Sequence, residues 1–245
     1  MYQTVSVIIP AHNEERYLAR CIQSIKKAAR QYPGKTEIIV VCNRCTDKTA
    51  QIAEKCGARA IRNEDTCIAK VRNAGIAAAS GEIIVTIDAD NRMTAGTIRE
   101  AAAKLRSKKY IGGGAPIRFE RLSAPLLLQE LLCAAGFRIT GLYCGIFWAE
   151  KKSFQRIGGF ADKRAMEDIA TAKALKKLGK QQAKQYGCLK QNHLINSTRK
   201  WDEMGDWLYF RMLIQNAGAF LRFAAGDHSA VDHLIDKMFY QYNDR

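Results

Sequence analysis

The stretch Glu82-Ile83-Ile84-Val85-Thr86-Ile87-Asp88-Ala89-Asp90 joins a run of apolar, mostly β-branched residues to a pair of carboxylates. Such a run is typical of a strand buried on both faces of a parallel sheet. Asp88 and Asp90 are two residues apart, so in extended backbone both side chains project to the same face. Two oxygen ligands on one face suit a hard divalent cation that also bridges phosphates. The alternative is that both residues simply cap the following turn.

Strand and helix patterns alternate around this stretch through the first half of the chain. We predict strands over Val5–Ile9, Glu37–Val41, Arg59–Ile61 and Glu82–Ile87. Helices are predicted between them, with Asn13, Thr46 and Thr94 as caps and with Gly81 ending the helix over Ile68–Ser80. Because alternating strands and helices form mostly parallel sheets, we predict an α/β fold with a single, mostly parallel central sheet flanked by helices.

Ligands of such sheets bind outside the carboxyl ends of the strands. The pattern therefore puts Ala11–Glu14, Cys42–Asp47 and Asp88–Asn91 on one rim.

The second half of the chain is less regular. It predicts a strand over Tyr110–Phe119 with a bend at its glycines, an apolar helix over Ala124–Ile139, a strand over Leu142–Ala149 and a helix over Met166–Leu178.

Composition narrows the class of protein. The chain has 245 residues, of which 47% are hydrophobic, and this is enough for a globular domain with a sizeable core. The formal net charge of +15 favours anionic partners such as nucleotide phosphates, lipid headgroups or nucleic acid, although a solvated basic surface is the alternative. No signal peptide or membrane-spanning run is predicted, so we expect a cytoplasmic protein whose 8 cysteines are reduced.

Several motifs together resemble family 2 glycosyltransferases. The first is Val7-Ile8-Ile9-Pro10-Ala11-His12-Asn13-Glu14-Glu15, and the next is Ala69-Lys70-Val71-Arg72-Asn73-Ala74-Gly75. Ala79-Ser80-Gly81-Glu82 and Ile87-Asp88-Ala89-Asp90 follow, and then Phe147–Phe154, Gly158-Gly159-Phe160 and Glu167-Asp168. The resemblance covers roughly Val5–Leu178, and the order and spacing of these motifs are more specific than any one of them.

The resemblance implies a GT-A fold in one domain over residues 1–245, with a Rossmann-like nucleotide-sugar-binding half at 1–110 and an acceptor-binding half at 111–245. It also implies an inverting transferase that uses Mn²⁺ or Mg²⁺ and a nucleotide diphosphate sugar, with a UDP- or GDP-sugar expected. By this analogy Asp90 binds the metal, and Asp88 contacts the ribose or supports the metal.

The resemblance places further residues at the donor. These residues lie at the rim loops or on the Arg72 helix; they are Pro10, Ala11, Glu14, Lys70, Arg72 and Ala89. Arg72 would also supply the positive charge that a phosphate-binding site needs, although an exposed helix residue without a ligand is the alternative.

Glu167-Asp168 matches the family's acidic pair at the start of a helix, with Glu167 near the acceptor or diphosphate. We predict that Asp168 is the general base, because a carboxylate must lie within hydrogen-bond reach of the attacking hydroxyl. The alternative is that both acids only favour a helix N-terminus.

The chain departs from the family pattern at Cys42-Asn43-Arg44-Cys45, where members usually have acidic or Asp-Asn residues. One of those acids commonly contacts the nucleotide base, so the identity of the base stays open, with Asn43 as a candidate contact. The Cys-x-x-Cys spacing also allows a redox role or a zinc site, but Cys56 and Cys67 lack paired spacing and core thiols are favoured.

Three later residues complete the candidates. His193 is a candidate third metal ligand, and Arg199 and Trp201 are candidate contacts to the diphosphate or acceptor, from a partial resemblance near the end of the chain. A loop histidine without a metal is the alternative for His193.

The apolar segment 122–149 is interrupted by Glu130 and Arg138. It could receive an apolar acceptor or lie at the inner face of a membrane as a peripheral contact, or it could be an interdomain core.

Competing functions are less well supported. A nucleotidyltransferase or a dinucleotide-binding dehydrogenase would have a glycine-rich loop where this chain has Ala11-His12-Asn13-Glu14. A non-catalytic nucleic-acid-binding protein is suggested only by the charge, because the basic residues are scattered and no known module is recognisable, so we expect no nucleic-acid partner. A non-catalytic nucleotide-binding member of the same family is the remaining alternative.

Overall fold

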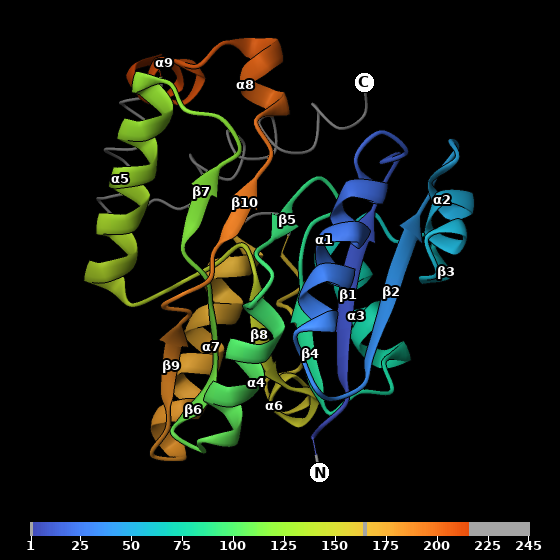
Figure 1. Ribbon diagram of the computed structural model, residues 1–245. Helices are drawn as coiled ribbons and strands as arrows, with labels where there is room; N and C mark the ends of the chain where they lie inside the picture. Colours follow the sequence, from blue (N-terminus) through green and yellow to red (C-terminus); the bar gives the residue numbers. More distant parts are fainter. Residues whose placement is uncertain (1, 164–165, 216–245) are drawn as a thin grey trace. The chain divides into compact units, whose positions relative to one another are not determined.

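The computed structural model describes residues 2–163 and 166–215 (Figure 1). The chain forms two compact units. Unit 1 comprises Met1–Glu120 and Glu130–Ser197, and unit 2 comprises Arg121–Gln129 and Thr198–Arg245. The predicted division at residue 110 falls inside unit 1.

Strands and helices alternate through the first half of the chain, and the second half is less regular. Along the described residues the strands are β1 (Val5–Ala11), β2 (Thr36–Asn43), β3 (Arg59–Asn63), β4 (Ile83–Thr86), β5 (Arg92–Met93), β6 (Tyr110–Gly114), β7 (Ile117–Phe119), β8 (Phe147–Glu150), β9 (Gln185–Cys188) and β10 (Leu194–Asn196). The helices are α1 (Leu18–Arg30), α2 (Thr49–Lys55), α3 (Ile68–Ala78), α4 (Thr97–Arg106), α5 (Ala124–Thr140), α6 (Lys151–Arg156), α7 (Glu167–Gln181), α8 (Arg199–Met204) and α9 (Leu208–Gln215).

The central sheet has seven strands in the order β3-β2-β1-β4-β8-β6-β9. β1 runs parallel to β2 and β4, whereas β8 runs antiparallel to both of its neighbours, β4 and β6. The predicted mostly parallel α/β sheet is therefore confirmed. A second sheet of three strands, β5-β10-β7, accompanies it and was not predicted.

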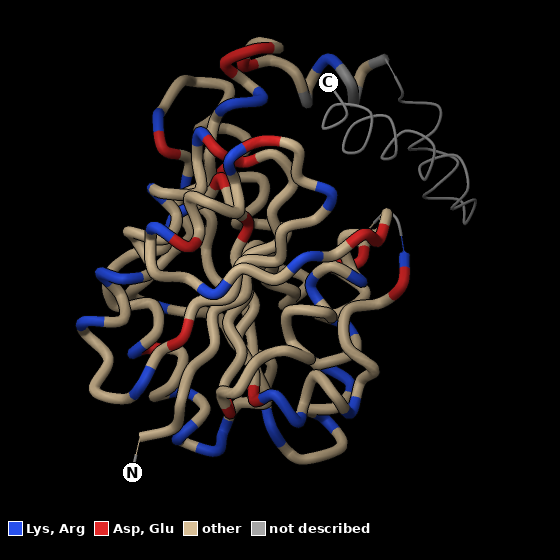
Figure 2. The backbone as a smooth tube through the Cα atoms, turned by 90° about the vertical axis from the view of Figure 1, so that its right-hand side faces the viewer, with Lys and Arg blue, Asp and Glu red and all other residues tan. Residues whose placement is uncertain are grey.

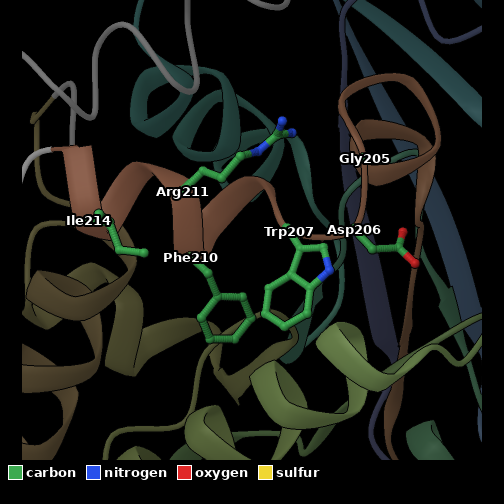
Figure 3. A pocket seen from close by; sticks show the side chains of 6 residues that line it. All are labelled: Gly205, Asp206, Trp207, Phe210, Arg211 and Ile214. Atoms are coloured by element: carbon green, nitrogen blue, oxygen red, sulfur yellow. The ribbon is translucent and has the colours of Figure 1, made fainter.

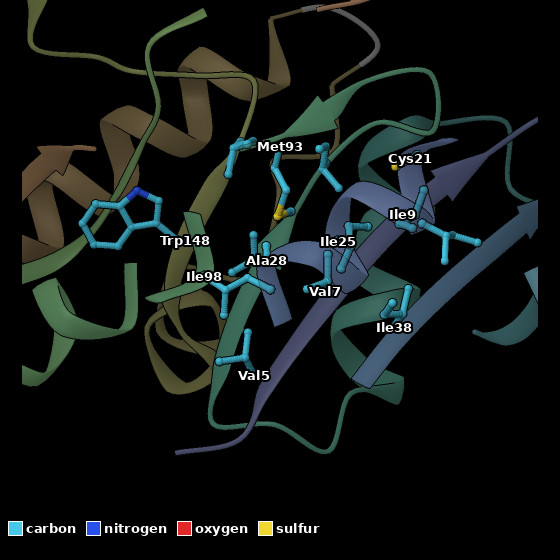
Figure 4. Packing of buried hydrophobic residues seen from close by; sticks show 14 of the residues in the cluster. Val5, Val7, Ile9, Cys21, Ile25, Ala28, Ile38, Met93, Ile98 and Trp148 are labelled. Carbon is cyan, nitrogen blue, oxygen red and sulfur yellow. The ribbon is translucent and has the colours of Figure 1, made fainter. Parts of the chain in front are cut away.

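Both faces of the central sheet are buried, as the largely apolar strands predict. Val5, Val7 and Ile9 of β1 point to the face that α1 and α4 cover (Figures 1 and 4). Ile8 points to the other face, where it belongs to a second cluster formed with residues of α3, α6 and α7. The period of two along β1 therefore fixes the layers, with helices on either side of the sheet.

Close packing of α3 on β1 requires a glycine at position 75. A Cβ there would lie 2.3 Å from Cγ2 of Ile8 and 2.9 Å from Cγ2 of Val41. We expect Gly75→Ala to lower the free energy of unfolding by about 1–2 kcal/mol, because the cost of overpacking exceeds the helix propensity gained. Gly136 of α5 is the matched control, since nothing lies within 4 Å of its added Cβ, and Gly136→Ala should stabilise the protein. Urea denaturation measures both; a stabilised Gly75→Ala would contradict the packing argument.

The predicted helix caps were wrong. The N-cap residues of α1, α2 and α4 are Tyr17, Lys48 and Gly96, and none of them makes a side-chain capping hydrogen bond. Asn13 instead accepts hydrogen bonds from the Thr46 backbone nitrogen at 2.8 Å and from the Thr46 hydroxyl at 3.4 Å, so both side chains link loops rather than begin helices. Likewise α3 ends at Ala78, before Gly81.

The segment Tyr110–Phe119 was predicted as one bent strand but forms β6 and β7 in different sheets. Glycines let the sheet pack closely here, since a Cβ on Gly113 would lie 2.0 Å from the Gly187 carbonyl oxygen. Within α5 only Pro125 and Leu126 are buried, whereas most of β8, at the end of the same apolar segment, is buried in the central sheet. None of the described helices is long and apolar enough to cross a membrane.

Candidate functional site

The loops after β1 and β2 meet at one rim of the sheet, as predicted. Besides the Asn13–Thr46 bond, Nδ1 of His12 lies 2.7 Å from the Asn43 carbonyl oxygen. The Glu14 backbone nitrogen donates to Oγ1 of Thr49 at 2.8 Å, and Glu14 is 8% exposed. The predicted donor residues Pro10 and Ala11 are buried at the end of β1. The rim is therefore a bonded unit, not two independent loops.

Asn43 holds this rim to the loop after β3. Its side-chain nitrogen donates to Oδ1 of Asn63 at 3.0 Å and to the Asp65 carbonyl oxygen at 2.7 Å. Recognition of a base edge by that nitrogen would require one of these bonds to break. If Asn43 contacts the nucleotide base, as predicted, we expect its side-chain oxygen to accept the hydrogen bond, because its side-chain nitrogen is already used.

The Asp88-Ala89-Asp90 motif lies in a turn beyond β4, which ends at Thr86. The Asn91 backbone nitrogen donates to the Asp88 carbonyl oxygen at 3.1 Å. The argument that strand alternation puts both carboxylates on one face was therefore wrong, because neither residue is in extended strand. Ala89 is buried, Asp90 is half-buried, and the Asp88 side chain is 39% exposed.

Arg72 of α3 joins the two acidic motifs. Its guanidinium donates through Nη2 to Oδ1 of Asp88 at 2.8 Å. Through Nη1 it donates to Oε1 of Glu167 at 2.8 Å and to Oδ1 of Asp168 at 2.9 Å. The Arg72 side chain is only 7% exposed, so these are charge-assisted bonds largely shielded from water. The predicted donor aspartate and the predicted base thus share one cation.

Asn73, next to Arg72 in α3, holds the segment that precedes α7. Asn73 donates from Nδ2 to the Phe160 carbonyl oxygen at 3.0 Å and accepts from the Phe160 backbone nitrogen at 2.8 Å. The guanidinium carbon of Arg72 lies 5.1 Å from the centre of the Phe160 ring, a cation–π distance. Gly159 has φ +81°, and a Cβ there would lie 2.4 Å from Oδ1 of Asn73. The Asn73 role was missed in the sequence, although both partners lie in the motifs that carry the family resemblance.

Asp168 has an unusual electrostatic environment. Burial raises its pKa to about 7, and Glu167 and Asp88 act in the same direction, whereas Arg72 opposes them. Glu167 and Asp168 form the first turn of α7, as predicted. A carboxyl group whose pKa is near neutral can accept a proton at neutral pH and hold it, which is what a general base must do.

The predicted metal ligands are not preassembled. Among residues 2–163 and 166–215 no group of three or more His, Cys, Asp or Glu side chains could hold a metal ion. Asp88 and Asp90 offer the hard oxygen ligands that Mn²⁺ and Mg²⁺ prefer, and such ions commonly take further ligands from substrate phosphates and water. The residues present therefore fit a cation that arrives with a diphosphate.

His193 precedes β10, which pairs with β5, the strand that follows Asp90. Its backbone nitrogen donates to Oγ1 of Thr94 at 3.1 Å. Burial lowers the pKa of His193, which favours the neutral imidazole that can bind a metal. Its role as a ligand stays a prediction.

Lys70, Arg199 and Trp201 make simpler contacts. Nζ of Lys70 lies 3.5 Å from Oδ2 of Asp162, and both side chains are at least half exposed. Trp201 is 5% exposed, and its Nε1 donates to Oε1 of Gln129 at 3.2 Å, so it packs inside unit 2. Arg199 is the first residue of α8 in the same unit. Their predicted contacts to a diphosphate or an acceptor stay predictions.

Unit 2 contains an open hollow near α9 (Figure 3). Trp207 and Phe210 pack edge to face there with ring centres 5.4 Å apart. The other lining residues are Gly205, Asp206, Arg211 and Ile214. None of the predicted site residues lines this hollow.

Comparison with known proteins follows the same motifs. Residues 6–154, more than half of the chain, match the model of a family described as glycosyl transferase family 2. A poly(ribitol-phosphate) beta-N-acetylglucosaminyltransferase, TarS, of Staphylococcus aureus is 32% identical over 105 residues, covering 40% of this chain and 18% of that protein. An uncharacterized glycosyltransferase of Mycobacterium tuberculosis is 33% identical over 101 residues, covering 41% of this chain and 43% of that protein. The chain thus spans less than half the length of these curated relatives.

Solved structures share the fold. TarS residues 1–349 with UDP-GlcNAc have a TM-score of 0.63 at 19% identity, covering 79% of this chain and 58% of that one. A Pyrobaculum calidifontis mannosyltransferase with GDP-Man and Mn²⁺ has a TM-score of 0.61 at 21% identity, covering 78% and 55%. A Mycobacterium tuberculosis glucosyl-3-phosphoglycerate synthase with Mn²⁺ and UDP has a TM-score of 0.58 at 23% identity, covering 86% of this chain and 77% of that one. The predicted GT-A fold is confirmed.

Proposed function

Since the chain belongs to glycosyl transferase family 2, we propose that it transfers a sugar from a nucleotide diphosphate sugar to a hydroxyl acceptor with inversion at the anomeric carbon. The observation that carries this proposal is the Arg72 guanidinium, which holds Asp88 and Asp168 in one network. The bound UDP-GlcNAc, UDP and GDP-Man of the structural neighbours support a UDP- or GDP-sugar as donor. We extend the proposal to a single transferase domain, located in the cytoplasm.

In the proposed mechanism the rim loops bind the nucleotide, with Glu14 and Asn43 as contacts and Lys70 near the phosphates. Asp168 takes the proton of the acceptor hydroxyl while that oxygen attacks the anomeric carbon from the face opposite the diphosphate. Arg72 keeps the base oriented and balances part of the negative charge of the three carboxylates. A divalent cation held by Asp88 and Asp90, Mn²⁺ or Mg²⁺, would neutralise the leaving diphosphate.

The acceptor is open in this proposal. Leu131, Leu132 and Ile139 of α5 are 59%, 54% and 85% exposed, which fits an apolar acceptor or a peripheral membrane contact. Figure 2 shows Lys and Arg spread over many loops and helices rather than gathered on one element. That distribution gives no support to nucleic-acid binding.

Nucleotide binding is the direct test. Thermal unfolding is measured with UDP, GDP, CDP and dTDP, each with and without Mn²⁺. We expect one nucleotide to raise the Tm in a metal-dependent way, by about 5–10 °C at about 100 times its Kd. Asp90→Ala should abolish the shift, whereas Glu54→Ala, at an exposed position of α2, should retain it. A folded protein that responds to none of the nucleotides would overturn the proposal.

The pH dependence of donor turnover tests the base. We expect kcat/KM to be full above neutral pH and to fall as pH falls through about 7, because the raised pKa of Asp168 leaves it protonated below that value. Nucleotide release, with water as the acceptor if no other is known, measures the rate across a pH series. A fall only near 3.8, the ordinary pKa of aspartic acid, would contradict the assignment.

A further inference from the structure

Cys42 and Cys45 are a thiol pair at the end of β2, on the rim where the nucleotide is proposed to bind. Both are free cysteines; Cys42 is 4% exposed and Cys45 is half-buried. Cys42 lies opposite Ala11 in the pairing of β1 with β2, and Sγ of Cys45 lies 3.4 Å from the Ala11 carbonyl oxygen. Both cysteines therefore lie beside Ala11, at the end of β1.

The two thiols also lie against the same hydrophobic cluster, with Cys42 inside it and Cys45 packed on it. Interaction with the Cys42 thiol is the main cause that lowers the pKa of Cys45 to about 6. Interaction with Cys45 and burial raise the pKa of Cys42. The more accessible sulfur is thus the one favoured as thiolate, the form that reacts with disulfides.

We propose that Cys42 and Cys45 form a thiol–disulfide exchange site, which reacts reversibly with low-molecular-weight disulfides and thereby changes the nucleotide-binding rim. The covalent reaction does not depend on the proposed transferase function. The effect on nucleotide binding does rest on that proposed function.

The exchange balances with a disulfide such as oxidised glutathione as the oxidant. The Cys45 thiolate attacks one sulfur, the glutathione S–S bond breaks, and one glutathione leaves as a thiolate that takes up a proton. Cys42 then loses its proton and its sulfur attacks the Cys45 sulfur, which releases the second glutathione. Two protein thiols lose two electrons and two protons in total, and the small disulfide gains them as two thiols.

Formation of the disulfide is expected to move the rim, because a disulfide holds its two sulfurs about 2.0 Å apart and both cysteines are free thiols in this structure. The segment between the two cysteines carries Asn43, whose carbonyl oxygen is bonded to His12 and whose side chain is bonded to Asn63 and Asp65. Arg44, also between them, has φ +46°, so the turn already has little conformational freedom. The disulfide form is therefore expected to bind nucleotide more weakly.

The covalent site is tested by treating the full-length protein with oxidised glutathione and measuring mass. We expect the wild type to lose the mass of two hydrogens, to yield a peptide cross-linked between Cys42 and Cys45, and to recover with dithiothreitol. Cys42→Ser should stop at a glutathione adduct on Cys45, and Cys45→Ser should form neither product. Cys56→Ser, at a half-buried cysteine after α2, is the matched control and should behave as wild type. Unchanged reactivity in Cys45→Ser, or no cross-link in the wild type, would overturn the site.

The effect on the rim is tested with the nucleotide and Mn²⁺ that shift the Tm of the reduced protein. We expect at least about tenfold weaker affinity after oxidation, or about 1.4 kcal/mol, and no change in oxidised Cys45→Ser. Equal affinity in both forms would overturn the link to binding. If the reduced protein binds no nucleotide, the transferase proposal fails, and the mass measurement still decides whether the thiol site exists.

Discussion

Asp168→Asn is expected to lower the rate of sugar transfer by about 10²–10⁴-fold while leaving donor binding intact. Asparagine keeps the shape of the side chain but cannot take the proton of the acceptor hydroxyl, and general base catalysis contributes about that factor. Arg72 keeps its bonds to Asp88 and Glu167 in this variant, so the donor side of the network should persist.

Two measurements separate this outcome from misfolding. The nucleotide-dependent Tm shift should match that of the wild type, and the steady-state rate should not. Glu54→Gln, which removes a carboxylate from an exposed position of α2, is the control and should retain full activity. An Asp168→Asn protein that turns over at the wild-type rate would show that the proton goes elsewhere.

Arg72→Gln is expected to have the largest combined effect on stability and activity. It leaves Asp88, Glu167 and Asp168 without the guanidinium that pairs all three. Breaking a buried charge network by removing one partner costs about 3 kcal/mol, or roughly 6–12 °C in Tm for a chain of this size. The pKa of Asp168 should rise further because Arg72 is the cation that lowers it, so the pH profile should shift to higher pH.

Arg72→Lys distinguishes charge from geometry. Lysine restores a positive charge but lacks the planar fork that reaches carboxylates on two sides, so stability should recover more than kcat does. Lys173→Gln is the matched control, because it removes one charge from an exposed position of α7. If Arg72→Gln unfolds like the wild type and keeps its pH profile, the network is unimportant to both properties.

The sequence predicted the central sheet well because its strands are largely apolar runs, such as Val5–Ile9, which can be recognised locally without knowledge of their partners. It failed at helix starts for a physical reason. Asn13 has the right chemistry for a cap, but its oxygen satisfies a backbone nitrogen 33 residues away. Local propensity cannot distinguish these two uses of one acceptor.

For the candidate site too, the sequence predicted some features and missed others. Its residues were predicted individually, because the motifs that carry them resemble a family. The pairing of Arg72 with Glu167 and Asp168 spans 95 and 96 residues, and no periodicity in the sequence encodes it. The thiol pair at Cys42 and Cys45 was visible as a spacing, but only the fold shows which sulfur is accessible.

The two hydrogen bonds between Asn73 and Phe160 have a consequence for protein engineering. They connect the predicted donor half at 1–110 to the predicted acceptor half at 111–245. A chimera that exchanges acceptor halves between related enzymes at residue 110 would separate the asparagine from the glycine-containing turn shaped to receive it. Donor and acceptor specificities are therefore best recombined as modules that carry α3 together with residues 158–168.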